Sequence, residues 1–175
     1  MRTRARAPEI PLLLRMVDGG YEKKAWHGPN LRGSIRGLTI QEAAWRPTVG
    51  RHNIWEIVVH AAYWKYIVLR RLRGGRKGTF PLHGSNWFVR PVTARLSDWR
   101  ADVALLEAMH RTMRAAIAQL TSIELQKIPS GSKVSTVALV SGIAAHDVYH
   151  AGQIQLLKRL ARTGARPDVN SKPRT

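Results

Sequence analysis

Two histidines four residues apart, His146 and His150, carry the strongest indication of chemistry in this chain. Side chains at that spacing on a helix lie on the same side. Ile143 and Ile154 fall on the same face, which indicates that this face is buried. Two imidazoles in an apolar setting are costly to desolvate without a partner, and a divalent metal ion would be such a partner. A third ligand would then have to come from elsewhere in the chain.

A third histidine, His60, is a candidate for that ligand. It shares a predicted helical face with Ile57 and Trp64, so we expect it to face the core from a different helix. Helical bundles build metal sites from side chains on facing helices. Neutral imidazole suits zinc, nickel, iron or copper, and three protein ligands leave a coordination position open. The alternative is that each is a core histidine held by a hydrogen bond, because periodicity alone does not prove that the three converge. The other histidines within the bundle are predicted to be exposed or locally hydrogen-bonded: His52, His83 and His110.

Four further residues are candidates for the surroundings of this site. Asp147 gives the pattern His-Asp-x-x-His, one methylene from the zinc-protease motif His-Glu-x-x-His in which the acid is the general base. Because it is turned about 100° from His146 on a helix, we expect it to orient a ligand or form a salt bridge rather than to catalyse. Tyr149 and Gln153 are predicted to line a pocket. His27, at the end of the first predicted helix, is a further candidate for a pocket wall or a helix cap.

The composition indicates one globular domain. The 175 residues are enough to bury a core, and a hydrophobic content of 44% is ordinary for a globular protein. No run approaches the roughly 18 uninterrupted apolar residues of a membrane span, and the N-terminus does not resemble a secretory signal. We therefore expect a cytoplasmic protein without a membrane partner. Because the chain has no cysteine, any metal must be held by nitrogen and oxygen, and any thiol must come from a cofactor or substrate.

The chain is strongly basic, since 29 Lys and Arg residues against 11 Asp and Glu residues give a net charge of +18. Such a charge favours polyanions and acidic small molecules. The basic residues are spread over both tails and over two predicted helix C-termini, where cations are favourable in any protein. No nucleic-acid-binding module is recognisable. Nucleic-acid binding through the basic surface is therefore an alternative that we do not favour.

Helical periodicity predicts four long helices, and strand signals are weak. The long helices are expected at about 9–26, from about 53 to the Gly74–Gly75 stop, at 97–120 and at about 135–161. A short helix is predicted at 39–44, where Thr39 and Glu42 have the spacing of a capping box. The loop of about 20 residues after Gly75 exceeds usual loop lengths, which indicates that it is partly structured or functional.

Four long amphipathic helices in one domain predict an all-α fold, a four-helix bundle with a short extra helix between helices one and two. Residues 166–175 are polar and contain two prolines, which is typical of a disordered terminus. The predicted boundaries are a basic N-terminal tail at 1–8, the bundle at 9–163 and a disordered C-terminal tail at 164–175.

Three segments resemble motifs of the DinB/YfiT-like superfamily. Residues 145–154 (AHDVYHAGQI) are similar to its C-terminal signature, and residues 53–60 (NIWEIVVH) are similar to its second-helix motif. Residues 25–29 (AWHGP) are similar to a recurrent opening in one branch. The resemblance extends over roughly residues 9–163. It implies a four-helix bundle, commonly assembled as a homodimer, with a metal site formed by His60, His146 and His150.

The resemblance also implies a function. Some members are metal-dependent transferases or isomerases that work with low-molecular-weight thiols such as bacillithiol or mycothiol. We therefore expect a transferase that activates such a thiol for a small-molecule substrate, with one divalent zinc, nickel or iron ion. The alternatives are a hydrolase that uses metal-activated water with Asp147 as base, a basic nucleic-acid-associated stress protein with a scaffold bundle, and a member that has lost metal binding. The charge of +18 is unusually basic for this family.

Overall fold

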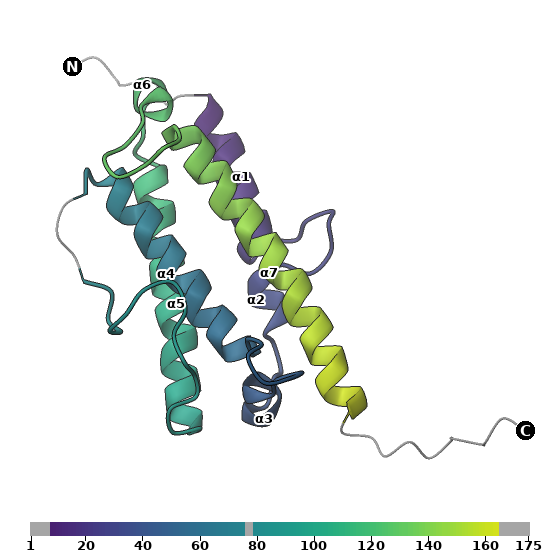
Figure 1. The fold of residues 1–175 in the computed structure, drawn as a ribbon. Helices are drawn as coiled ribbons and strands as arrows, with labels where there is room; N and C mark the ends of the chain where they lie inside the picture. Colours follow the sequence, from purple (N-terminus) through teal and green to yellow (C-terminus); the bar gives the residue numbers. More distant parts are fainter. Residues whose placement is uncertain (1–7, 76–78, 165–175) are drawn as a thin grey trace, which may run out of the picture.

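The computed structural model describes residues 8–75 and 79–164, and in these ranges its regular structure is entirely helical (Figure 1). The helices are α1 (Glu9–Tyr21), α2 (Leu31–Ser34), α3 (Ile40–Ala44), α4 (Ile54–Leu72), α5 (Leu96–Ile117), α6 (Ser122–Gln126) and α7 (Thr136–Gly164). The predicted all-α class is confirmed. The predicted tails at 1–8 and 164–175 lie outside the described residues, apart from Pro8 and Gly164. No helix in the described ranges is long and apolar enough to cross a membrane.

The four long helices α1, α4, α5 and α7 form a bundle (Figure 1). Helix α4 packs against both α5 and α7, and α1 packs against α7. The short helices α2 and α3 lie in the connection between α1 and α4 and contact α7, whereas α6 joins α5 to α7. The structure thus has the predicted four-helix arrangement and the predicted extra helix. Helices α2 and α6 are additional, because periodicity over a long window does not reveal single turns.

Side-chain caps set where the second long helix and the extra helix begin. The Asn53 side chain accepts a hydrogen bond of 2.8 Å from the Glu56 amide and starts α4. Thr39 and Glu42 form the predicted capping box of α3, with both reciprocal hydrogen bonds present. These local signals fix the start of α4, and with it the position of every side chain that α4 contributes to the interior.

The first helix is shorter than predicted. It ends at Tyr21, whereas apolar spacing predicted an end near residue 26. The amides of Glu22 and Lys23 both donate to the carbonyl oxygen of Asp18, at 2.9 and 2.8 Å, and close the last turn. Trp26, which the pattern counted as part of the helix, is fully exposed. The side chain at this position therefore does not contribute to the core, and the helix stops where its buried face stops.

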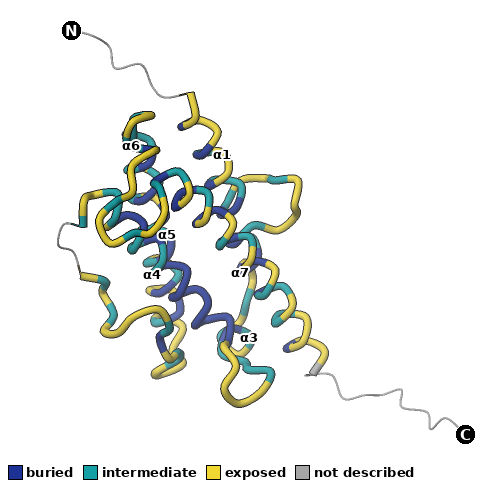
Figure 2. Tube along the Cα trace, turned by 45° about the horizontal axis from the view of Figure 1, so that its top comes forward, coloured by how far each residue is buried: buried dark blue, intermediate teal, exposed yellow. Residues whose placement is uncertain are grey.

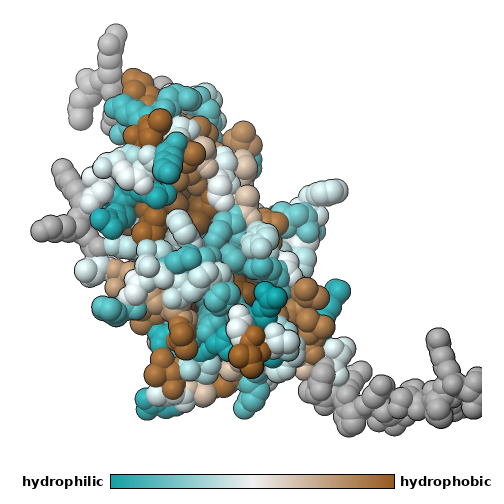
Figure 3. Space-filling view, in the orientation of Figure 1, coloured by the Kyte–Doolittle hydropathy of each residue, from teal (hydrophilic) through white to brown (hydrophobic). Residues whose placement is uncertain are grey.

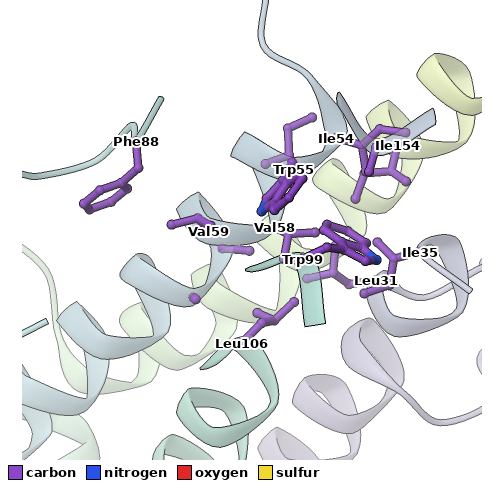
Figure 4. Close-up of a cluster of buried hydrophobic side chains, with 14 of the residues drawn as sticks. Leu31, Ile35, Ile54, Trp55, Val58, Val59, Phe88, Trp99, Leu106 and Ile154 are labelled. Atoms are coloured by element: carbon purple, nitrogen blue, oxygen red, sulfur yellow. The ribbon is translucent and has the colours of Figure 1, made fainter. Parts of the chain in front are cut away.

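Two clusters of buried apolar side chains form the core. One surrounds Trp55 of α4 and includes side chains from α2, α5 and α7 (Figure 4). The other surrounds Met113 of α5 and includes side chains from α1, α4, α6 and α7. Figure 2 shows that the first half of α4 is buried almost continuously. Figure 3 shows hydrophilic and apolar patches side by side on the face in view.

A layer of buried polar side chains lies between the two apolar clusters. Lys65 of α4 forms an ion pair with Asp147 of α7, and their exposures are 0% and 1%. The Lys65 ammonium lies 5.0 Å from the centroid of the Tyr21 ring, and this ring stacks on the imidazole of His110 at 3.7 Å. In each helix the polar residue stands between members of the two clusters: Ala62, Lys65 and Val68 in α4, Leu106, His110 and Met113 in α5, and Ala144, Asp147 and Ile154 in α7.

The imidazole of His110 is buried without hydrogen bonds. It is 1% exposed, and neither ring nitrogen has a partner among the described residues. The prediction of an exposed or locally bonded histidine was therefore wrong, because His110 lies on the same helical face as Leu106 and Met113. Burial, with a smaller contribution from the charge of Lys65, lowers the pKa of His110 to about 3.

We expect a His110→Phe variant to lose less stability in acid than the unchanged protein. The imidazole has a pKa of about 6.5 in the unfolded chain, so the unfolded state binds a proton before the folded state does as the pH falls. The stability linked to His110 is complete above about pH 6.5 and declines by about 1.4 kcal/mol per pH unit below it, towards the folded pKa of about 3. Between pH 6.5 and pH 4.5, the free energy of unfolding measured with urea should fall by about 2 to 3 kcal/mol less in the variant than in the unchanged protein. Equal declines in the two proteins would count against this assignment.

Candidate metal centre

The three histidines predicted as ligands come together between α4 and α7. His60 extends from α4, and His146 and His150 extend from α7. The Nε2 atom of His146 lies 3.2 Å from Nε2 of His60 and 3.1 Å from Nε2 of His150. One nitrogen from each ring lies within 4.8 Å of the other two. The packing of α4 against α7 thus supplies the convergence that periodicity left open.

Two of the imidazoles are oriented by carbonyl oxygens. The Nδ1 atom of His60 donates to the backbone oxygen of Asn86 at 2.9 Å, and Nδ1 of His150 donates to Oε1 of Gln153 at 2.7 Å. Because a carbonyl oxygen only accepts, both rings carry their proton on Nδ1, and Nε2 keeps its lone pair. Carbonyl partners of this kind fix the tautomer and the orientation of metal-binding histidines.

The long loop between α4 and α5 holds His60 in place. Asn86 provides its backbone oxygen to His60 and its side-chain oxygen to Nε1 of Trp64, the latter at 2.9 Å. The ring of Trp87 is stacked between the imidazoles of His52 and His60, with centroid separations of 3.6 and 3.8 Å. These contacts agree with the prediction that this loop is partly structured or functional.

The three imidazoles are neutral at neutral pH. Burial lowers the pKa of His60, and it lowers the pKa of His150 to about 4. Burial together with the two neighbouring imidazoles lowers the pKa of His146 to about 3. Neutral imidazole is the form that binds metal ions, so the site needs no proton to be removed before an ion enters.

These features fit a divalent transition-metal ion. Three neutral ring nitrogens converge, and two of the rings are fixed with their Nε2 lone pairs directed at the third. Nε2 of His146 lies close to Nε2 of both other rings, so it is the atom that this ring can offer to a ligand shared with the others. Nitrogen donors of this type suit zinc, nickel and iron. His60, His146 and His150 would hold the ion.

A cavity of about 560 Å³ opens beside His150, one of the three histidines. His150 belongs to the histidine group and also lines this cavity, together with Tyr149 and Gln153. The volume is typical of small-molecule sites. The structure thus brings two of the predicted pocket residues to the candidate metal centre.

The other two candidates, His27 and Asp147, do not line this cavity. His27 lines a separate cavity of about 400 Å³, which Gly152 and Arg159 of α7 also line. Asp147 is buried beside the histidines and forms the ion pair with Lys65. It lines neither cavity, and its second oxygen, Oδ1, has no hydrogen-bond partner among the described residues.

Sequence reasoning did not identify three residues that shape the site: Lys65, Asn86 and Trp87. A signal existed for Lys65, because it lies on the helical face of Ala61 and Leu69 rather than on a polar face. For the two loop residues the only signal was the unusual length of the loop. A loop has no periodicity, so its sequence does not tell which side chains turn inward.

A helical bundle in which three imidazoles converge from two facing helices fits a helical protein that binds a metal ion. The model of the DinB superfamily matches residues 25–154, which is most of the chain and includes all three histidines. The chain belongs to the DinB superfamily, as the motifs predicted. No curated protein and no solved structure shows a significant match to it.

We expect a Gln153→Leu variant to bind metal about 10- to 100-fold more weakly, because His150 loses the acceptor that fixes its tautomer. Gln153 is itself held by the Tyr149 hydroxyl, which accepts from its amide nitrogen at 3.0 Å. Gln155→Leu is the matched control, since Gln155 lines only the other cavity. Competitive titration of zinc with a chromophoric chelator measures both affinities. Equal affinities would show that this hydrogen bond does not support the site.

Proposed function

We propose that the protein is a metal-dependent transferase that activates a low-molecular-weight thiol for reaction with a small molecule. The observation that supports this most directly is the position of His150, which belongs to the three-histidine group and also lines the cavity of about 560 Å³. A bound divalent ion would lower the pKa of a thiol beside it and so supply thiolate at neutral pH.

The residues around the cavity have distinct roles in this proposal. Gln153 keeps the His150 ring in the orientation that presents Nε2 to the ion. Ile57 and Leu157 form apolar walls, which limit the access of water that would compete with the thiol. In the transfer the thiol sulfur bonds to an electrophilic carbon, the leaving group departs with its bonding electrons, and the thiol proton passes to solvent.

The absence of cysteine supports a thiol that comes from outside the chain. The hydrolase alternative with Asp147 as general base has less support, because that carboxylate pairs with Lys65 and does not line the cavity. The proposal of a nucleic-acid-associated scaffold would leave the converging imidazoles without a role. The homodimer that the family resemblance implies is also a proposal, and a doubled mass in analytical ultracentrifugation is its expected result.

Conjugation of 1-chloro-2,4-dinitrobenzene tests the transferase proposal. The metal-stripped protein and the protein reloaded with zinc, nickel or iron are each assayed with a series of low-molecular-weight thiols. We expect turnover above the uncatalysed rate with at least one thiol, lost on stripping and regained on reloading. Metal binding without metal-dependent turnover for any thiol would argue against a transferase and leave only the metal site.

A further inference from the structure

The cavity beside the histidines is apolar on most of its walls. Ile57 of α4 and Leu156 and Leu157 of α7 line it, and Tyr149 lies at its exposed rim. Both faces of the Trp87 ring are covered by imidazoles, so this ring presents its edge rather than a face to the cavity. An apolar body on the occupant would therefore gain from burial here.

The charge on the cavity wall has one sign. Arg51 lines the cavity, and no Asp or Glu is among the lining residues. The Arg51 guanidinium forms no ion pair or hydrogen bond with any described residue. An unpaired guanidinium beside apolar walls favours a carboxylate, sulfonate or phosphate group on the occupant.

Hydrogen bonds from neighbouring side chains hold the loop that carries Arg51. Arg46 donates to the backbone oxygen of Arg51 at 2.5 Å, and it also forms a two-pronged ion pair with Glu56 of α4. His52 bonds the same carboxylate at 2.9 Å. Glu56 is 3% exposed and is neutralised by these partners, so it does not cancel the charge of Arg51 in the cavity. The cation thus stands on a backbone fixed before any ligand arrives.

We infer that this cavity takes a substrate with an apolar body and one anionic group, and that Arg51 selects the anion. The inference rests on the proposed function, because it assigns this cavity to the co-substrate of the thiol. It names a chemical class that neither the converging imidazoles nor the overall basic charge specifies. Arg51 would act by binding the anion and would not take part in the bond changes.

Two probes that differ by one anionic group test the inference. They are 1-anilinonaphthalene-8-sulfonate and N-phenyl-1-naphthylamine, which shares its ring system and lacks the sulfonate. Fluorescence titrations would use the full chain, metal-stripped and metal-loaded. The variants are Arg51→Gln, Arg51→Lys and Arg159→Gln, the last of which removes one charge from the other cavity.

We expect Arg51→Gln to lower the affinity for the sulfonate probe about fivefold, as for the loss of one partly exposed charged hydrogen bond. The affinity for the neutral probe should not change. Arg51→Lys should retain most of the affinity, and Arg159→Gln should change neither probe. Equal weakening by Arg51→Gln and Arg159→Gln would trace the effect to net charge and overturn the inference, as would no effect of Arg51→Gln. Failure of the protein to bind metal would refute the proposed function. The probe titrations on metal-stripped protein would still test whether the cavity binds an anion through Arg51.

Discussion

We expect a His146→Ala variant to lose stoichiometric metal binding while the protein stays folded. His146 is the ring whose Nε2 atom contacts both other imidazoles, at 3.2 and 3.1 Å. Its Nδ1 atom has no hydrogen-bond partner among the described residues, so the substitution removes a ligand without breaking a hydrogen bond at Nδ1. The loss of affinity should exceed the roughly 10- to 100-fold expected for a residue that only supports a ligand. Elemental analysis after gel filtration in dilute metal measures the stoichiometry.

The matched control is His110→Ala, which removes a buried imidazole that lies outside the site. It should keep one metal ion per chain, and circular dichroism of both variants should show the helical content of the unchanged protein. Full metal occupancy in His146→Ala would refute the three-histidine centre. Loss of metal in both variants would point to a general loss of structure, which the circular dichroism spectra would reveal.

We expect Lys65→Met to destabilise the protein by about 3 to 5 kcal/mol, because it leaves the carboxylate of Asp147 in the interior without its cation. Burial raises the pKa of Asp147, and the charge of Lys65 is what opposes that rise. Without the ammonium, the side chain must either stay charged in an apolar setting or take up a proton. Urea unfolding of the metal-free protein measures the change without a contribution from metal binding.

The double variant Lys65→Met/Asp147→Leu should recover most of the lost stability, since two apolar side chains of suitable size replace the pair. Arg162→Met is a matched control, because Arg162 also pairs across to another helix, at 2.6 Å from Glu42, but is about half exposed. We expect it to cost less than about 1 kcal/mol. A Lys65→Met variant no less stable than Arg162→Met would show that the buried pair contributes little.

The fold was predictable because its signals are local or periodic. The capping pairs at Thr39 and Asn53 fixed the starts of two helices, and the apolar repeat of each long helix fixed its buried face. The end of α1 was not predictable in the same way. Trp26 continues the apolar pattern, yet its side chain has no place in the core. Composition does not distinguish a buried tryptophan from an exposed one.

The candidate ligands and the nearby α7 residues Tyr149 and Gln153 were predictable, and the contribution of the long loop was not. His146 and His150 share a face by spacing, and His60 shares the apolar face of its own helix. What completes the site comes from contacts distant in sequence, such as the bond from His60 to the backbone oxygen of Asn86. A backbone oxygen has no side-chain signature. For His110 the spacing from Leu106 and Met113 did indicate a buried face, but nothing in the sequence indicates that its ring nitrogens lack hydrogen-bond partners among the described residues.

The buried pair of Lys65 and Asp147 also sets the register of α4 against α7. A slide of α7 by one turn would move Asp147 about 5.4 Å along the bundle and leave both charges facing apolar neighbours. The same slide would shift His146 and His150 along α4 by the same distance, so that the three rings would no longer meet at one point. One alignment of the two helices therefore satisfies the charges and gathers the imidazoles, so the register that is least costly electrostatically is also the one that assembles the centre.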